Sequence, residues 1–200
     1  MKIAIILGSI RIGRRSHHVA AYLQQRLSQF RGVEAEVIDP AEHALPLMDE
    51  RYGMHPSPSE LLLFLGEKIK AADAYILLSP EYNGSYSGVL KNVVDYFGRQ
   101  MSGKPIGVTT VSGGRLGGIN ASHHLQSLVL SIQAYPQPQK LLVSQVQDLF
   151  DEAGQVIQES FVAQVDSYLK AFLPFAHALV GSRRDPWLPE TIDDSAAVNA

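Results

Sequence analysis

The stretch Lys2-Ile3-Ala4-Ile5-Ile6-Leu7-Gly8-Ser9 joins an apolar run to a glycine and a serine. The run from Ile3 to Leu7 has no polar residue, which predicts a short strand buried on both faces. A signal-peptide core needs about 7–15 apolar residues and a membrane span about 20, so the run predicts neither. We therefore expect a cytoplasmic protein whose first strand lies inside a covered sheet.

Apolar runs of this kind alternate with stretches of helical periodicity. The pattern predicts strands over 2–7, 33–38, 74–79, 105–111 and 139–146, and helices over 16–30, 59–72, 87–99, 117–130 and 160–180. Pro174 falls inside the last helix and predicts a kink there. Strands that are apolar throughout need helices on both faces, so the pattern indicates an α/β fold with a doubly wound parallel sheet.

The length of the chain suggests one domain, which we place at residues 1–180. Residues 181–200 contain two prolines and lack a helical period, so they form a predicted C-terminal tail with Trp187 and Leu188 as its candidate anchor on a neighbouring subunit. Residues 39–57 form a long connection rich in proline, methionine and histidine. This connection either overhangs the ligand site or packs its methionines on the surface.

Charge and cysteine content exclude several classes of function. Seventeen Lys and Arg against twenty Asp and Glu give a net charge of −3, which disfavours binding to nucleic acid or to an anionic membrane. The chain has no cysteine, so disulfides, zinc–thiolate sites, iron–sulfur clusters and catalytic thiols are excluded. Any redox chemistry must rest on a group other than sulfur.

Ligands of doubly wound sheets bind beyond the carboxyl ends of the strands. The loop after the first strand, residues 8–17, leads into a helix N-terminus, where unpaired N–H groups attract anions. Its hydroxyl and guanidinium groups suit a phosphate; they belong to Ser9, Ser16, Arg11, Arg14 and Arg15. The alternative is a solvated basic loop in which Ser16 is an ordinary N-cap. No dinucleotide fingerprint or Walker loop is present, which favours a monophosphate.

Two further loops follow the third and fourth strands. In residues 80–88, Pro80 and Gly84 predict a stiff turn that presents backbone groups to the edge of a flat heterocycle; the alternative is a plain turn capped by Ser85 or Ser87. Residues 112–118 contain four glycines, which either let the backbone approach a ligand or simply make a flexible loop. Together the three loops suit a phosphorylated planar cofactor, and flavin mononucleotide (FMN) is the natural candidate.

The residues Gly8-Ser9-Ile10-Arg11 and the block from Pro80-Glu81-Tyr82-Asn83-Gly84-Ser85 through Gly88-Val89-Leu90-Lys91-Asn92-Val93-Val94-Asp95 resemble the NADPH-dependent FMN reductase family. The resemblance covers about residues 1–180. It implies a flavodoxin-like three-layer α/β/α fold with a five-stranded parallel sheet in the order 2-1-3-4-5. It also implies homodimers or dimers of dimers. Two features depart from the family pattern: Ser87 replaces a proline, and the first loop is longer than in the shortest members.

The resemblance also assigns site residues. It implies that the FMN phosphate is bound by Ser9, Arg11, Ser16 and His17, and that the ring contacts Pro80, Glu81, Tyr82, Asn83 and Gly84 on one edge and Ser112, Gly113 and Gly114 on the other. The roles of Arg14, Arg15 and His18 stay open, with the 2′-phosphate of NADPH as an alternative partner for Arg14 and Arg15. Neither adjacent histidine pair, 17–18 or 123–124, predicts a metal site, because neighbouring helical residues point about 100° apart.

The resulting hypothesis is a ping-pong oxidoreductase. NAD(P)H transfers a hydride to bound FMN, and a small acceptor such as free FMN, a quinone or an azo compound then takes two electrons. One alternative is a flavodoxin-like electron carrier without nucleotide turnover, although a net charge of −3 is mild for a carrier. The other alternative is a flavin-bound redox sensor.

Overall fold

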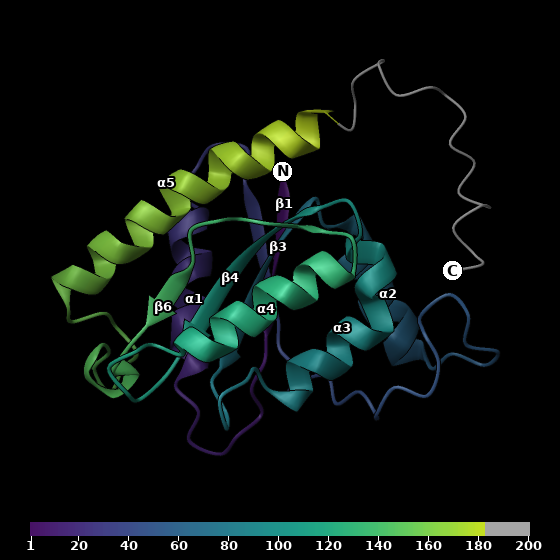
Figure 1. Ribbon diagram of the computed structural model, residues 1–200, viewed down its shortest axis with the longest axis horizontal. Helices are drawn as coiled ribbons and strands as arrows, with labels where there is room; N and C mark the ends of the chain where they lie inside the picture. Colours follow the sequence, from purple (N-terminus) through teal and green to yellow (C-terminus); the bar gives the residue numbers. More distant parts are fainter. Residues whose placement is uncertain (183–200) are drawn as a thin grey trace.

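The computed structural model describes residues 1–182, and Figure 1 shows their arrangement. The strands are β1 (Lys2–Leu7), β2 (Glu34–Ile38), β3 (Ala74–Pro80), β4 (Pro105–Val111), β5 (Tyr135–Pro136) and β6 (Leu141–Val143). The helices are α1 (Ser16–Leu27), α2 (Glu60–Ala71), α3 (Gly88–Met101), α4 (Ile119–Ser131), the 3₁₀ turn η1 (Val146–Asp148) and α5 (Glu159–Ser182). The predicted anchor residues Trp187 and Leu188 lie outside the described residues.

All strand pairs of the sheet are parallel, in the order β2-β1-β3-β4-β5, with β6 also paired to β4. In the central register, Ile5 of β1 lies between Val37 of β2 and Ile76 of β3. This confirms the predicted flavodoxin-like order 2-1-3-4-5, in which ligands bind at the carboxyl ends of the strands.

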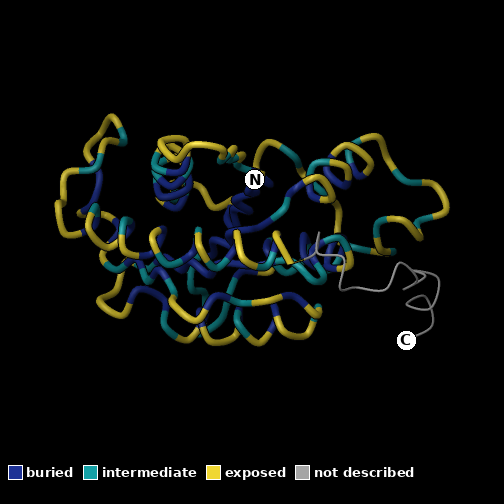
Figure 2. The backbone as a smooth tube through the Cα atoms, turned by 90° about the horizontal axis from the view of Figure 1, so that it is seen from above, coloured by how far each residue is buried: buried dark blue, intermediate teal, exposed yellow. Residues whose placement is uncertain are grey.

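The two faces of the sheet are both covered, as the apolar runs predict. Alternate side chains of β1 enter different cores: Ile3, Ile5 and Leu7 pack with α1 and α5, while Ala4 and Ile6 pack with α2, α3 and α4. Figure 2 shows the result from above, with buried segments between the layers and exposed turns on the outer sides of the helices. The fold is therefore the predicted three-layer α/β/α arrangement.

Two helix boundaries differ from the prediction. The first helix ends at Leu27 rather than near residue 30, because the Ser28 hydroxyl donates to the carbonyl of Gln25 and Phe30 is too exposed to hold a further turn on the core. The fourth helix begins at Ile119 rather than at Gly117, since Gly117 and Gly118 have positive φ angles of 60° and 81°. In the last helix, α5 continues through Pro174 to Ser182.

The predicted fifth strand, 139–146, is shorter than expected: only β6 (Leu141–Val143) lies within it, and a second short strand, β5 (Tyr135–Pro136), precedes it. Pro136 and Pro138 have no N–H to donate, so the chain cannot form a continuous ladder beside β4. Between the two prolines, the Gln137 amide still donates to the carbonyl of Ile106 at 2.9 Å. The fifth position of the sheet is thus shared by β5 and β6.

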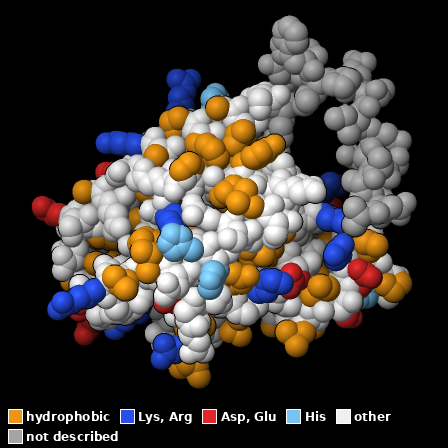
Figure 3. Space-filling view, in the orientation of Figure 1, with side chains coloured by type: hydrophobic (Ala, Val, Ile, Leu, Met, Phe, Trp, Pro, Cys, Tyr) orange, Lys and Arg blue, Asp and Glu red, His pale blue; other side chains and the backbone are white. Residues whose placement is uncertain are grey.

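Within residues 1–182, no helix has both the length and the apolar character that a membrane span requires. On the face seen in Figure 3, Lys and Arg side chains are scattered rather than gathered into one patch.

Candidate functional site

Three loops follow neighbouring strands at one edge of the sheet, and the first two project at the lower edge of Figure 1. We call them the first loop (8–15), the second loop (81–87) and the third loop (112–118). A 3.2 Å hydrogen bond between Ser9 Oγ and the Tyr82 hydroxyl joins the first loop to the second. The Glu81 amide donates at 3.1 Å to the carbonyl of Val111, the last residue of β4, which places the second loop beside the start of the third. The sequence-predicted site residues are thus brought to one place.

The first loop begins with a close approach of two backbones. A Cβ on Gly8 would lie 2.9 Å from Leu90 Cβ and 3.0 Å from the Leu78 carbonyl oxygen, so only glycine fits there. The Gly8 carbonyl accepts the Ser87 hydroxyl at 2.5 Å, and Ser87 Oγ accepts the Leu90 amide at 3.1 Å as the N-cap of α3. Ser87 therefore joins the base of the first loop to α3.

The second loop is a tight hairpin turn. Tyr82 and Ser85 exchange backbone hydrogen bonds of 2.8 and 3.1 Å, and the two residues between them, Asn83 and Gly84, have positive φ angles of 51° and 79°. Asn-Gly with this geometry is typical of a type I′ turn. Pro80 ends β3 opposite Val111, so it sets the direction of the turn. The loop is thus a tight turn at the position that the sequence predicts.

Glu81 contacts α4 rather than the interior of the second loop. Its carboxylate accepts the Ala121 amide at 3.1 Å and lies 3.5 Å from the Asn120 side-chain amide. The N-cap position of α4 is Gly118, which has no side chain to perform this role. Glu81 therefore caps α4 and places a negative charge at the positive end of its dipole.

The glycines of the third loop fall into two pairs. A Cβ on Gly117 would lie 2.8 Å from the backbone of Leu142, and Gly118 faces Thr110 at 3.0 Å, so the fold itself requires these two. Gly113 and Gly114 have only ordinary contacts near 3.4 Å, and packing alone does not require glycine there. The Ser112 hydroxyl accepts the Gly114 amide at 2.9 Å and shapes the start of the loop.

The N-terminus of α1 differs from those of α3 and α4 because no side chain caps it. The helix begins at Ser16 itself and its N-cap is Arg15, which makes no capping hydrogen bond, so the alternative of Ser16 as an ordinary N-cap is wrong. Ser16 is only 3% exposed, and within residues 1–182 neither its hydroxyl nor the buried Nδ1 of His17 has a hydrogen-bond partner. A phosphate at this position would accept from these groups and from the helix N–H groups, so the residues fit an FMN phosphate.

The cationic residues of the first loop have different environments. Arg11 and Arg15 are exposed, whereas Arg14 donates to both carboxylate oxygens of Asp39 and to the Ser9 carbonyl. Sequence reasoning missed Asp39, although its position directly after the apolar end of β2 placed it at the ligand edge of the sheet.

The two histidines at the start of α1 are neighbours in space as well, with ring centroids 3.9 Å apart. His18 also packs against Phe150. Burial lowers the pKa of His18, and the nearby His17 and Arg15 lower it further, while Asp151 opposes them. The lowered pKa favours the neutral imidazole. Within residues 1–182, no three His, Asp or Glu side chains are grouped so that they could hold a metal ion.

The long connection between β2 and α2 is fixed by a second residue that sequence reasoning did not assign to this role. Asn92 accepts the Met48 amide at 2.8 Å and donates to the Pro46 carbonyl at 2.7 Å. Met48 packs on the core beside α3, while Met54 is 47% exposed. The connection therefore packs one methionine and leaves the other at the surface.

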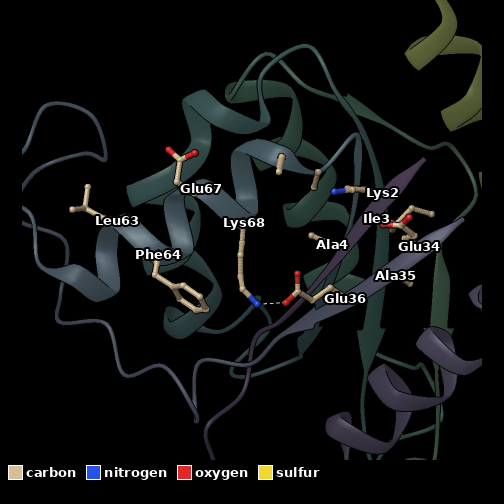
Figure 4. Close-up of a pocket in the computed structure, with 12 residues that line it drawn as sticks. Lys2, Ile3, Ala4, Glu34, Ala35, Glu36, Leu63, Phe64, Glu67 and Lys68 are labelled. Carbon is tan, nitrogen blue, oxygen red and sulfur yellow. Dashed lines mark hydrogen bonds and ion pairs between the residues drawn. The ribbon is translucent and has the colours of Figure 1, made fainter.

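A groove of about 760 Å³ lies away from these loops, along the first residues of β1 and β2 and the side of α2. Figure 4 shows Phe64 and Lys68 of α2 facing Glu36 of β2 across it. Lys68 pairs with Glu36 and lies 4.8 Å from the Phe64 ring centroid, so its charge is already compensated. The groove lies between α2 and the edge strand β2, at the opposite end of the strands from the predicted ligand site.

Comparisons with known proteins agree with this site. The sequence model of the family described as NADPH-dependent FMN reductase matches residues 1–148. An NAD(P)H-dependent FMN reductase of Pseudomonas aeruginosa is 31% identical over 187 residues, which cover 90% of this chain and 98% of that protein. An FMN-dependent NADPH-azoreductase of Staphylococcus aureus is 36% identical over 145 residues, 70% of this chain and 76% of that protein.

Among solved structures, a flavoenzyme NAD(P)H:(acceptor) oxidoreductase of Paracoccus denitrificans superposes with a TM-score of 0.73 at 24% identity, covering 88% of this chain and 97% of that one. The structural likeness supports the fold, and the sequence matches extend over most of the chain. The loops of the site, the strand order and the family match lead to one conclusion: the chain belongs to the NADPH-dependent FMN reductase family, with FMN as cofactor and NAD(P)H as electron donor.

Proposed function

We propose that this chain holds FMN non-covalently across its three loops and uses it to pass electrons from NAD(P)H to small flat acceptors. The observation that carries the assignment of the site is the buried Ser16 hydroxyl, which has no partner in the fold and lies at an uncapped helix N-terminus. Burying a hydroxyl without a hydrogen bond is costly, so such a group is expected to serve a ligand.

At the phosphate end, Ser16 and His17 would donate from the first turn of α1, where the helix dipole also favours an anion. Ser9 is 1% exposed and is held by Tyr82, so its hydroxyl is oriented toward the second loop. Arg11 would add a guanidinium from the exposed side of the first loop. These four residues form the phosphate site in this proposal.

At the ring end, the turn through Pro80, Tyr82, Asn83 and Gly84 would present backbone groups to one edge of the isoalloxazine, and Ser112, Gly113 and Gly114 to the other. The steric freedom at Gly113 and Gly114 supports this, because their own fold does not explain why they are glycines. FMN, when bound, would supply the redox chemistry, since its ring can take up a hydride and pass the two electrons and a proton to the acceptor. The chain contributes binding, orientation and backbone donors. Glu81 would act indirectly, by holding α4 in place.

The exposed apolar side chains of the first and third loops support a class of acceptor. Ile10 and Ile12 of the first loop are 55% and 98% exposed, and Leu116 of the third loop is 70% exposed. Exposed apolar side chains around a flavin would favour flat, weakly polar oxidants such as quinones and azo compounds. The azoreductase name of the Staphylococcus aureus relative supports the same class.

We also propose that the chain works as a homodimer or dimer of dimers in the cytoplasm. Exposed apolar side chains away from the three loops, such as Leu130 of α4 at 62%, support an assembly that covers them, and the NAD(P)H donor requires access to the pyridine-nucleotide pool of the cell interior. Light scattering of the purified protein and cell fractionation test these two points.

Reconstitution with FMN tests the proposal. Apo-protein should quench FMN fluorescence on binding, and Ser16→Ala should weaken FMN binding about tenfold while changing riboflavin, which lacks the phosphate, much less. Ser28→Ala, an exposed serine at the other end of α1, is the matched control and should bind like the wild type. Failure of the wild type to bind FMN contradicts the proposal. Binding without NAD(P)H oxidation in the presence of a quinone would instead indicate an electron carrier or a sensor.

A further inference from the structure

Arg14 is the cation of the first loop whose guanidinium is bonded to other groups of the fold. Nη1 donates to Asp39 Oδ1 at 2.7 Å and to the Ser9 carbonyl, and Nη2 donates to Asp39 Oδ2 at 2.5 Å. The side chains of Arg14 and Asp39 are 18% and 11% exposed. These bonds commit three of the five N–H donors of Arg14 to the fold, including both that form the fork on the Asp39 carboxylate.

Asp39 is itself held firmly where β2 ends. Its Oδ1 accepts the Ala41 amide at 2.9 Å, and its carbonyl accepts the amides of Glu42 and His43. Burial alone would raise the pKa of Asp39, but the hydrogen bonds from Arg14 and Ala41 and the Arg14 charge bring it below its ordinary value. The carboxylate therefore stays charged and provides a rigid anchor for Arg14.

The residues on the other side of Arg14 are those of the predicted phosphate site. Its guanidinium holds the Ser9 carbonyl, while its own amide donates to the Arg11 carbonyl at 3.1 Å and closes the turn of the first loop. Ser16 follows two residues later as the first residue of α1. One side chain thus ties the start and the end of the first loop to the end of β2.

We propose that Arg14 is a positioning residue. With Asp39 it forms a strut that holds Ser9, Arg11 and Ser16 in the arrangement that receives the FMN phosphate, and it contacts neither that phosphate nor the 2′-phosphate of NADPH. This inference rests on the proposed function, since it concerns the same FMN site. It separates Arg14 from Arg11 and Arg15, which share its charge and loop but are exposed.

The test is a fluorescence titration of FMN and of riboflavin against the wild type, Arg14→Gln, Asp39→Asn and the double variant. Each single variant should weaken FMN binding about tenfold, with riboflavin changed much less, because the strut acts on the phosphate end. The double variant should bind FMN about as tightly as the single variant with the lower affinity, because both substitutions remove the same ion pair. Arg14→Lys, which keeps the charge but loses the fork, should not restore binding fully.

The direction in which Asp39→Asn changes FMN affinity distinguishes a positioning role of Arg14 from direct contact with the phosphate. If Arg14 bound the phosphate directly, removing Asp39 would release the guanidinium, and FMN binding would be unchanged or tighter; either result overturns the inference. A lower ratio of kcat/KM for NADPH over NADH in Arg14→Gln also overturns it, because that ratio reports contact with the 2′-phosphate. Equal losses for FMN and riboflavin would show a general effect on folding and would overturn it as well.

The matched control is the ion pair of Arg26 with Asp166, which joins the other end of α1 to α5 and has side-chain exposures of 26% and 31%. Arg26→Gln and Asp166→Asn should leave the ratio of FMN to riboflavin affinity unchanged. Absence of FMN binding by the wild type would overturn the proposed function together with this inference. Wild-type binding with unchanged Arg14 and Asp39 variants would overturn the inference alone.

Discussion

The N-termini of α1 and α3 lie at the same edge of the sheet but are stabilised in different ways. Ser87 caps α3 and also donates to the Gly8 carbonyl, so every polar group of that side chain is used within the fold. At α1 the equivalent groups of Ser16 and His17 are buried and unpartnered, and the segment before the helix is held by Arg14 and Asp39 instead. The difference teaches that the polar groups of the α3 cap are satisfied within the fold, whereas those in the first turn of α1 are not.

The largest effect is expected at the contact that supports α3. Gly8→Ala would push a methyl group against Leu90 and the Leu78 carbonyl, and overpacking of this kind should lower the free energy of unfolding by about 3 kcal/mol. Urea denaturation measures it. Gly88→Ala is the control, because a Cβ there meets nothing within 4 Å. Equal stability of the two variants would contradict the close approach at Gly8.

The caps themselves give the next contrast. Ser87→Ala should cost about 2 kcal/mol of unfolding free energy, because it removes the α3 cap and leaves the buried Gly8 carbonyl without its donor. Ser59→Ala, which removes only the α2 cap, should cost about 1 kcal/mol. Ser16→Ala in the apo-protein should change stability by less than about 0.5 kcal/mol. A Ser16 effect as large as that of Ser87 would show that its hydroxyl already has a partner in the fold.

The Arg14–Asp39 strut predicts a pH dependence for the region before α1. Asp39 has a lowered pKa in the folded chain, so its stabilising contribution is complete above its unfolded pKa of about 3.9 and is lost as the pH falls through the folded value. Wild type should exceed Asp39→Asn by about 1 kcal/mol at neutral pH, and the gap should close below about pH 4. Denaturant titrations at several pH values measure the gap. A stability difference between wild type and Asp39→Asn that grows as the pH falls would contradict this prediction.

The smallest effect concerns α4, whose cap comes from another element. Glu81→Gln keeps an oxygen that can accept the Ala121 amide but removes the charge at the helix dipole, which should cost about 0.5 kcal/mol of unfolding free energy. FMN affinity should stay unchanged, because the carboxylate serves α4. Weaker FMN binding at unchanged stability would favour the ring contact that the sequence predicts for Glu81.

Strands β1, β3 and β4 were predictable because their apolar runs are nearly continuous, and β2 because it alternates. The expected position of the site followed from the edge at which parallel strands end. The hairpin turn at Asn83-Gly84 was also readable from the sequence, because that dipeptide specifies its own geometry. Arg14 was different. Its partner Asp39 lies 25 residues away, and no local pattern tells whether an arginine in a ligand loop will meet a ligand or a carboxylate of the fold.

Helix ends and caps show the same limit. Glu81 caps a helix that begins about forty residues later, and the sequence around it describes only its own turn. The prolines at 136 and 138 interrupt the ladder beside β4, and the apolar pattern of 139–146 alone does not reveal that interruption. Local chemistry thus decides turns and strands, while tertiary contacts decide which polar groups remain available to a ligand.

The split between β5 and β6 has a further consequence for how copies of the chain meet. A long edge strand offers a row of unpaired N–H and C=O groups on which another chain can add a strand and start aggregation. Here that edge is made of a two-residue and a three-residue strand, and prolines at 136 and 138 interrupt its donors. This side of the sheet is therefore a poor template for strand addition by a second copy.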